Sequence, residues 1–509
     1  PPAGRLGPAA PALRRRAPAL ALLRAAAREL PRPSYLVGGA LRDAWLGRPL
    51  LDLDVAVRGA RAGAARLARS LGASLVTLDA ENGVYRIVPK DRSPLSLDVC
   101  ELQGADIAAD LGRRDFTVNA LALELSPDLP AAVPAGAVLD PRGGLGDLRR
   151  RLLRCEDEKI LESDPLRVLR AFRLGAQLGL TIEAKTMPRL RRLRCRVRRS
   201  APERIAAELS LLLAQPGCPA WLARMDHAGL LTALFEDLEA ARQCALCYYG
   251  RGGVLRHTLE VCSRLDLLLA DPRRAFGAAA GPLLESFGER LAPGRPWRAW
   301  LMLAALLHDV SKPETAKRLG GRLRFFGHDL AGARRAAAVL KALRFPNEAA
   351  ELAAAVAEHH LRPGNLAAGG RLTDKAVYRF FRDLGEDAVP VLLVCWADHA
   401  SYLPHRRLER LLPAAAADPE TFDFSLVRPV EARKTLRHLQ VVSALLRRRF
   451  DAGRRPVPER ILDGHAVMKA LGIPPGPEVG RALEKLREAQ AEGKVRTKKE
   501  ALEFLKRAK

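Results

Sequence analysis

Apolar and polar residues follow different patterns in two parts of the chain. Three short apolar runs, at residues 35–37, 51–57 and 95–99, are separated by helix-like and turn segments up to Asp147. Short apolar runs bounded by turn residues are typical of strands. From Leu148 onward this pattern almost disappears, and Ala/Leu/Arg segments repeat their apolar residues with a helical period of 3.6. The sequence predicts an α/β module followed by helices.

We therefore predict an α+β chain with a tail, an α/β head, a helical neck, a helical body and a helical C-terminal region. The expected boundaries, in that order, are residues 1–33, 34–147, 148–215, 216–420 and 421–509. The tail is rich in Ala and Arg and is interrupted by Pro, so we expect it to be flexible.

The charge balance of the chain indicates what kind of molecule it binds. The 509 residues contain 84 Lys and Arg against 58 Asp and Glu, a formal charge of +26. Arg binds phosphate well, so a nucleic acid is one explanation, and a biased composition is the other. The longest apolar stretches are too short to span a membrane, and the eight Cys show no disulfide or zinc-finger spacing. We expect reduced thiols, a cytoplasmic location and no membrane association.

A double glycine precedes the first candidate site. Gly38 and Gly39 stand between an apolar run and a helix-compatible segment, where the backbone can approach a phosphate closely. In the next predicted strand, the period of two puts Asp52 and Asp54 on one face. Paired carboxylates favour Mg²⁺ and phosphoryl or nucleotidyl transfer. Asp98, in the third predicted strand, is a candidate third carboxylate, as a ligand or as a base.

Several motifs in a fixed order carry a resemblance to a known family. They are GGALRD at 38–43, DLD at 52–54, DLGRRDFTVNA at 110–120, LDPRGGLGDL at 139–148 and SDPLRVLRAFR at 163–173. This series resembles the class II tRNA nucleotidyltransferases and bacterial poly(A) polymerases, whose head has the polymerase-β-type fold.

The resemblance implies a role for each motif. Asp52 and Asp54 would hold Mg²⁺ while the RNA 3′-hydroxyl attacks the α-phosphorus of CTP or ATP. Asp115 and Asn119 would lie toward the ribose and the triphosphate. Asp164 and Arg167 would read the base, so that protein acts as the template. The other residues expected near the nucleotide are Gly38, Gly39, Arg42, Arg114, Arg170 and Arg173.

The proposed base-reading residues are spaced as on a helix. Asp164, Arg167 and Arg170 are three residues apart, which predicts neighbouring positions on one helix face. A carboxylate and a guanidinium can together address both sides of a base edge. The family usually has Glu where Ser163 stands, which affects only the local hydrogen bonding.

Two further segments point to RNA. Residues 189–199 carry seven Arg, which would contact phosphates without base specificity, and residues 200–209 resemble the family's neck. Residues 461–480 resemble the tail region of related proteins. His465 in that region is expected to be a turn residue.

Histidines and aspartates in the helical part form a second candidate site. Their order, H…HD…H…H…D, resembles that of the HD-type phosphohydrolases. Such ligands suit a divalent transition metal that activates water. His359 and His360 face different directions on a helix, and we prefer His359 as the ligand. The expected metal ligands are His257, His308, Asp309, His328, His359 and Asp398.

The sequence thus predicts an enzyme that adds C and A to the 3′ end of tRNA from CTP and ATP. The HD site is expected to hydrolyse 2′,3′-cyclic or terminal phosphates. One alternative is a poly(A) polymerase or a CC- or A-adding enzyme with the same motifs. The other is a non-catalytic RNA-binding protein, although three ionised side chains on one strand face argue against it.

Overall fold

The computed structural model describes residues 17–507 except positions 51, 91–94, 370 and 452–455. The chain divides into two compact units, Pro1–Ser200 and Ala201–Lys509, called here the head unit and the body unit. The expected neck, residues 148–215, is divided between them.

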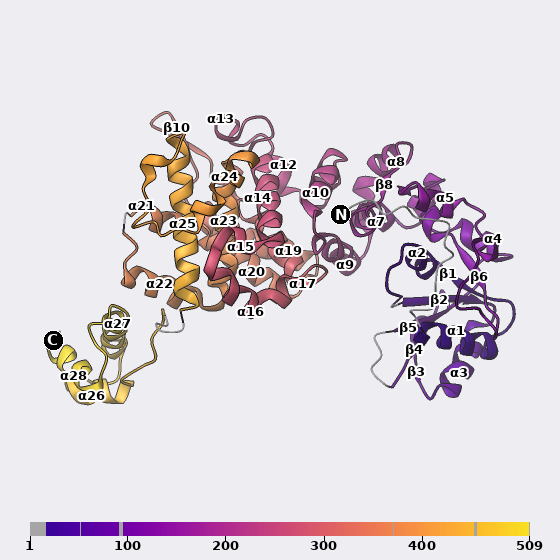
Figure 1. Ribbon diagram of the computed structural model, residues 1–509, viewed down its shortest axis with the longest axis horizontal. Coiled ribbons are helices and arrows are strands. Elements are labelled where there is room, and N and C mark those ends of the chain that lie inside the picture. The colour runs from indigo at the N-terminus through magenta and orange to yellow at the C-terminus, as the bar shows by residue number, and fades with distance from the viewer. Residues whose placement is uncertain (1–16, 51, 91–94, 370, 452–455, 508–509) are drawn as a thin grey trace. The chain divides into compact units, whose positions relative to one another are not determined.

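Within the described residues, the head unit contains one mixed sheet with the strand order β3-β4-β5-β2-β1-β6 (Figure 1). Strand β2 pairs in parallel with β5 and antiparallel with β1. The three predicted runs correspond to β1, β2 and β5, and position 51 lies outside the described residues. The strands are β1 Ser34–Val37, β2 Asp52–Val57, β3 Ser74–Asp79, β4 Val84–Val88, β5 Ser96–Glu101 and β6 Ala122–Glu124.

Helices surround this sheet and continue to the end of the unit. Helix α3 packs on β3, β4 and β5. Strands β7 (Leu152–Leu153) and β8 (Thr181–Ile182) form a short parallel pair. The α-helices are α1 Ala17–Glu29, α2 Gly39–Trp45, α3 Ala60–Ser70, α4 Ile107–Gly112, α5 Gly144–Arg149, α6 Glu158–Ser163, α7 Leu166–Leu178 and α8 Thr186–Leu193. The 3₁₀ helices η2, η3 and η4 of the described residues span Thr117–Asn119, Ala135–Ala137 and Arg194–Arg199.

The N-terminal segment differs from its prediction. Where a flexible tail was expected up to residue 33, α1 packs against α3. Leu23, Ala26 and Ala27 are buried, because their spacing of three or four residues gives the helix one apolar face. From residue 17 onward the tail prediction is therefore wrong.

Where the structure describes it, the body unit is helical, as expected, apart from the hairpin of β9 (Lys317–Leu319) and β10 (Arg322–Arg324). Helix α14 packs on α17 and α23, and α20 packs on α17 and α19. The helices up to α19 are α9 Pro202–Leu213, α10 Cys218–His227, α11 Leu230–Leu234, α12 Asp237–Ala241, α13 Leu246–Tyr249, α14 Gly253–Ala270, α15 Pro272–Phe276, α16 Ala280–Leu291, α17 Pro296–Leu307, α18 Lys312–Thr315 and α19 His328–Ala342.

The C-terminal helices α26, α27 and α28 enclose a small apolar core of their own, which includes Val467, Leu486 and Leu505. Helix α27 also packs on α22. The remaining helices are α20 Asn347–His359, α21 Arg362–Ala368, α22 Asp374–Leu384, α23 Ala388–Ser401, α24 His405–Ala415, α25 Glu431–Arg449, α26 Gly464–Leu471, α27 Pro477–Ala491 and α28 Lys498–Arg507.

Gly144 fixes the distance between α5 and η2. A Cβ at Gly144 would overlap the carbonyl oxygen of Thr117, whereas a Cβ at Gly136 would meet open space. We expect Gly144→Ala to destabilise the head unit by about 1–3 kcal/mol, because the backbone of η2 must move. Gly136→Ala should change stability by less than about 0.5 kcal/mol. Thermal unfolding followed by circular dichroism tests this, and equal midpoints for both variants would contradict it.

Candidate active site and metal centre

The pairing of β2 with β5 gathers three carboxylates, called here the carboxylate cluster: Asp52, Asp54 and Asp98. The parallel register puts Asp54 opposite Asp98 and Asp52 opposite Ser96. Ser96 Oγ donates a hydrogen bond of 2.7 Å to Asp52 Oδ1. Leu53, between the two acids of β2, is completely buried. The alternation expected from the sequence is therefore present.

The cluster concentrates negative charge. Burial raises the pKa of Asp54, the charge of Arg114 opposes this rise, and the charges of Asp98 and Asp52 add to it. A divalent cation among these oxygens would relieve the repulsion. Carboxylate oxygens are also the ligands that Mg²⁺ prefers, so the residues present fit this ion.

Asp98 has a partner that the sequence did not reveal. Arg86 on β4 donates two hydrogen bonds of 2.8 Å to the two carboxylate oxygens of Asp98. Residues 86 and 98 are opposite each other in the antiparallel pairing of β4 with β5. The signal was absent because β4 was not predicted as a strand.

Gly38 allows Arg114 to approach the cluster. Its φ is +73°, a left-handed conformation that favours glycine. A Cβ at this position would lie 2.9 Å from Arg114 Nη1 and 3.8 Å from Asp54 Oδ2. Gly39 begins helix α2, so the structure contains the turn that the double glycine predicted.

A buried chain of polar contacts connects three segments of the head unit. Arg42 Nη1 on α2 donates to Asn119 Oδ1 over 2.5 Å, and Asn119 Nδ2 donates to Asp115 Oδ1 over 2.8 Å. Asp115 Oδ2 lies 2.6 Å from Arg170 Nε on α7. Burial alone would raise the pKa of Asp115, but the charge of Arg170 and the hydrogen bond from Asn119 lower it below its ordinary value. The resemblance named all four residues, and the structure brings them together.

The expected base-reading pair is arranged differently from the prediction. Asp164 lies in the bend between α6 and α7, and its Oδ1 accepts a hydrogen bond of 3.2 Å from the Leu166 amide. Arg167 is in the first turn of α7 and donates to the carbonyl oxygens of Ile160 (2.9 Å) and Arg113 (3.1 Å). Asp164 is therefore not on the same helix face as Arg167 and Arg170, because α7 begins at Leu166.

Arg173, the remaining expected nucleotide ligand, lies further along α7. It is buried and its Nη1 donates a hydrogen bond of 2.8 Å to Gln177 Oε1.

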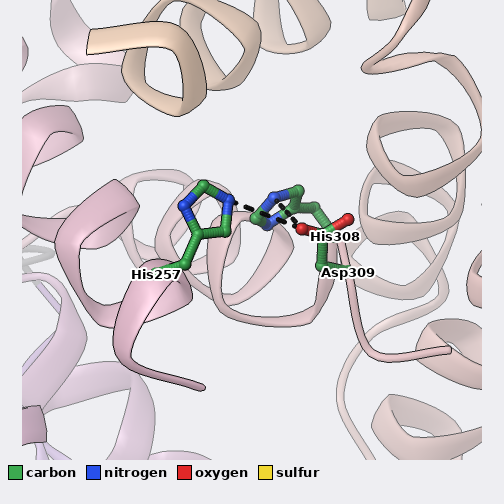
Figure 2. A group of neighbouring side chains, drawn as sticks. All are labelled: His257, His308 and Asp309. Atoms are coloured by element: carbon green, nitrogen blue, oxygen red, sulfur yellow. Dashed lines mark ion pairs between the residues drawn. The ribbon is translucent and has the colours of Figure 1, made fainter. Parts of the chain in front are cut away.

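Four helices of the body unit, α14, α17, α19 and α20, bring histidines to one aspartate. His308 and Asp309 follow the end of α17, and His257 comes from α14. The Nε2 atoms of His257 and His308 lie 3.5 Å and 3.2 Å from Asp309 Oδ2. Figure 2 shows both imidazoles turned toward this carboxylate. On the other side, the Nε2 atoms of His328 and His360 each lie 3.6 Å from Asp309 Oδ1.

Asp398, on α23, joins the same group. Its Oδ1 lies 3.1 Å from His257 Nε2. We call these six residues the histidine group: His257, His308, Asp309, His328, His360 and Asp398.

The second nitrogen of several rings is held by the backbone. The Nδ1 atoms of His308, His328 and His360 bond to the carbonyl oxygens three residues earlier, at 2.8, 2.6 and 2.8 Å. These bonds leave Nε2 as the acceptor in the neutral ring. The buried Nε2 atoms of His308 and His328 have no hydrogen bond of good geometry. Buried polar atoms without partners that converge on a carboxylate fit a divalent metal.

His360 takes the position expected for His359. His360 is buried, whereas the His359 side chain is 24% exposed and lies 3.7 Å from Glu358 Oε1. Adjacent residues differ by about 100° around a helix, so only one of the two can face the group. Burial lowers the pKa of His360 to about 4, which keeps the ring neutral, as a metal ligand must be. The structure thus replaces His359 by His360.

Two further residues at this group were missed by the sequence reasoning. Lys312 Nζ lies 2.5 Å from Asp309 Oδ2 and donates to the Tyr249 hydroxyl over 3.0 Å. Lys312 follows Asp309 by one helical spacing of three residues, which was a usable signal. Nothing in the sequence around Tyr249 indicated its place.

Comparisons with known proteins decide the family. The chain is 35% identical over 492 residues to the CC-adding tRNA nucleotidyltransferase of Thermus thermophilus, covering 93% of each chain. The chain belongs to the tRNA nucleotidyltransferase family. Another member, the A-adding tRNA nucleotidyltransferase of Deinococcus radiodurans, is 32% identical over 94% of this chain and 96% of that one. The family assignment confirms the expected enzyme class and contradicts the non-catalytic alternative.

Three protein-family models match parts of the present chain. The Poly A polymerase head domain matches residues 34–154, the probable RNA and SrmB-binding site of polymerase A matches residues 179–242, and the HD domain matches residues 254–403. Nucleotidyltransferase and HD domains typically bind divalent metals, and in the body unit the ligand atoms of His257, His308 and Asp309, and those of Asp309, His328 and His360, lie close enough together to hold one.

Solved structures of this family have the same fold. The complex of a CCA-adding enzyme with CTP has a TM-score of 0.65 and 20% identity, covering 97% of this chain and 96% of that one. The Thermotoga maritima CCA-adding enzyme complexed with tRNA has a TM-score of 0.63 and 20% identity, with the same coverage. The predicted architecture is thereby confirmed. Among the described residues, no helix is long and apolar enough to cross a membrane.

The buried contact between Asp115 and Arg170 gives a first prediction for this family member. Asp115→Asn removes the charge that opposes Arg170, whose side chain is 42% exposed. We expect a stability loss of about 1–2 kcal/mol and at least a tenfold lower kcat/KM for the nucleotide. Urea unfolding and nucleotide incorporation measure these effects. Glu162→Gln, which breaks the exposed pair with Arg196, is the control and should change neither quantity.

The exchange of His359 for His360 gives a second prediction. We expect His360→Ala to lower the metal content of the purified protein at least twofold, because one neutral ligand is lost. His359→Ala should retain the wild-type content. Inductively coupled plasma mass spectrometry measures the metal, and thermal unfolding followed by circular dichroism shows that each variant is folded. Equal loss in the two variants would contradict the assignment.

Proposed function

We propose that this chain adds C and A nucleotides to the 3′ end of tRNA, using CTP and ATP in the cytoplasm. The observation that supports this most is the carboxylate cluster on β2 and β5, within a chain that is similar over nearly its full length to tRNA nucleotidyltransferases. The name of the Thermus thermophilus relative states C addition to tRNA, and the proposal extends this substrate to the present chain.

Asp52 and Asp54 would hold Mg²⁺ in the proposed reaction. Bound there, Mg²⁺ would neutralise charge on the triphosphate and make the RNA 3′-hydroxyl a better nucleophile. The hydroxyl oxygen bonds to the α-phosphorus while the bond from that phosphorus to the bridging oxygen breaks, so pyrophosphate leaves. Asp98 is proposed to accept the hydroxyl proton, which requires its ion pair with Arg86 to open.

The nucleotide is proposed to lie against the chain of polar contacts from Arg42 to Arg170. Arg42, Arg114 and Arg170 supply positive charge for the triphosphate. Asn119 orients Arg42, Asp115 orients Arg170, and Asp110 accepts the hydrogen bonds of Arg114. Arg173 is proposed to add to this charge from the next turn of α7.

Asp164 and Arg167 are proposed to read the base. For this role, the Arg167 side chain must exchange its two carbonyl partners for the base edge. Arg in residues 189–199 would contact the RNA backbone, which makes binding dependent on salt.

A narrower candidate has specific support. The Geobacter sulfurreducens relative, 30% identical over 96% of this chain, is named a CC-adding tRNA nucleotidyltransferase, as is the one from Thermus thermophilus. Addition of C alone, with A added by a second enzyme, is therefore the second candidate. A poly(A) polymerase would instead extend RNA with ATP alone.

Incorporation of labelled nucleotides into tRNA that lacks its CCA end tests these candidates. Our first proposal predicts products three nucleotides longer when CTP and ATP are present. Two added C residues and no A would support the second candidate, and long tracts from ATP alone would contradict both.

The carboxylate assignment is tested in the same assay. We expect Asp52→Ala and Asp54→Ala to lower the rate of addition at least 10³-fold with little change in tRNA affinity, because the metal ligands are lost. Asp128→Ala, which removes an exposed carboxylate of the head unit, is the control and should add nucleotides at the wild-type rate. Wild-type rates for Asp54→Ala would contradict the assignment.

We further propose that the histidine group is a metal-dependent phosphohydrolase site. His257, His308, His328 and His360 would hold a divalent transition metal, with Asp309 between them and Asp398 at one side. Such a metal would supply an activated water for attack on a 2′,3′-cyclic or terminal phosphate. The partnerless Nε2 atoms support this more than any other observation.

Removal of two ligands separates the two proposed activities. We expect the variant with His308→Ala and Asp309→Ala to lose hydrolysis of nucleoside 2′,3′-cyclic phosphate and bound metal, while nucleotide addition continues unchanged. Phosphate release and tRNA extension are measured on the same preparation. Hydrolysis at the wild-type rate would show that this chemistry lies elsewhere.

A further inference from the structure

Aromatic rings continue from the histidine group to the surface. The Tyr249 ring stacks on His257 with centroids 4.5 Å apart and an interplanar angle of 18°. The Tyr402 ring lies 5.4 Å from His257 at 29° and 6.4 Å from Tyr249 at 26°. Tyr402 is 51% exposed. The outermost member of this stack therefore offers an aromatic ring to solvent directly beside the proposed metal ligands.

A basic hairpin lies next to the same group. Strands β9 and β10 expose Lys317, Arg318, Arg322 and Arg324, and residues 317–324 contain no acidic side chain. Exposed cations close together on a short hairpin repel one another, so they cost stability unless an anion is bound. The hairpin is thus suited to contact phosphates.

One hydrogen bond joins the hairpin to the segment that carries part of the aromatic stack. The Tyr248 hydroxyl donates to the Leu323 carbonyl oxygen over 2.9 Å, and Tyr248 adjoins Tyr249. After β10 the chain enters a turn in which the Phe325 carbonyl oxygen lies 2.6 Å from Nδ1 of His328. The hairpin is therefore anchored beside Tyr249 and directly precedes one of the histidines.

Aromatic faces beside cations are the two elements with which proteins bind single-stranded nucleic acid. Stacking of a base on an aromatic ring contributes about 1–3 kcal/mol, and cations pair with the backbone phosphates. Tyr402 is exposed enough for a base to stack on it. The cations of the hairpin can pair with the additional phosphates of an RNA strand, which a free nucleotide lacks.

We propose that the histidine group acts on the end of an RNA strand, with the terminal base stacked on Tyr402 and the preceding phosphates on the β9–β10 hairpin. This inference rests on the phosphohydrolase activity proposed above and specifies its substrate: a polynucleotide end in preference to a free nucleotide. This RNA site is distinct from the proposed site for the tRNA end in the head unit, because Tyr402 and residues 317–324 belong to the body unit.

Steady-state kinetics of the whole, metal-loaded protein test the hairpin. The substrates are a decaribonucleotide that ends in a 2′,3′-cyclic phosphate and the corresponding mononucleoside cyclic phosphate. The variant with Arg318→Ala, Arg322→Ala and Arg324→Ala should raise KM for the decaribonucleotide about tenfold at low salt. Its KM for the mononucleotide should stay unchanged.

A matched variant removes the same charge at other exposed positions of the body unit: Arg273→Ala, Arg274→Ala and Lys341→Ala. It should leave both KM values at the wild-type level. An unchanged KM of the hairpin variant for the decaribonucleotide would overturn the proposal, as would equal effects of the hairpin and matched variants.

Tyr402 is tested by two substitutions. Tyr402→Ala should raise KM for both substrates about fivefold or more, whereas Tyr402→Phe, which keeps the ring, should restore KM to the wild-type value. Metal content should stay constant in both variants. If Tyr402→Ala leaves both KM values unchanged, the base does not stack there.

Crosslinking distinguishes failure of this inference from failure of the hydrolase proposal. A decaribonucleotide with a 3′-terminal 4-thiouridine and a 3′-phosphate is irradiated with the wild-type protein, and crosslinked peptides are identified by mass spectrometry. Crosslinks to peptides that contain Tyr402 or residues 317–324 support RNA binding even when no hydrolysis is measured. Crosslinks confined to the head unit would overturn the inference.

Discussion

The parallel pairing of β2 with β5 is the constraint on which the head unit depends. It puts Asp54 opposite Asp98 with Asp52 two residues earlier, so three carboxylates lie on the same face of two adjacent strands. The repulsion among these carboxylates and the burial of Asp54 would destabilise the sheet if no positive charge opposed them. Arg86 and Arg114 provide opposing charge, and Gly38 lets Arg114 come close. A divalent cation bound among the carboxylates would oppose their charge more strongly than one guanidinium does.

Asp309 is the residue around which the histidine group of the body unit is arranged. Each of its oxygens faces two imidazoles, and Lys312 balances its charge. Burial alone would raise the pKa of Asp309, but the neighbouring His308 and His257 imidazoles and the charge of Lys312 hold it well below its ordinary value. Asp309 is thus kept ionised by basic neighbours, which is the state that metal coordination requires. In the head unit, burial raises the pKa of Asp54, so a bound cation would be needed to favour its ionised form.

Much of this could be predicted from the sequence because strand alternation and motif order are local properties. The alternation placed Asp52 and Asp54 correctly on one face, and the motifs collected Arg42, Asn119, Asp115 and Arg170 before their contacts were known. What failed depends on tertiary structure. Strand β3 is exposed along nearly its whole length and has no alternating burial, so it gave no signal. Strand β4 does alternate in burial but was not predicted, so its Arg86 was missed.

Helix boundaries caused the remaining errors. Asp164 was expected on a helix that begins only at Leu166, and a periodic pattern does not locate such a bend. To choose between His359 and His360, one must know which face of α20 packs against the histidine group. The sequence of two adjacent residues does not show this.

Anomalous diffraction from crystals of the whole protein with Mn²⁺ and a non-hydrolysable CTP analogue tests the central claim most directly. We expect a manganese peak within about 2.3 Å of carboxylate oxygens of both Asp52 and Asp54, with the triphosphate bound beside it. A bound nucleotide with no metal on these two residues would contradict it.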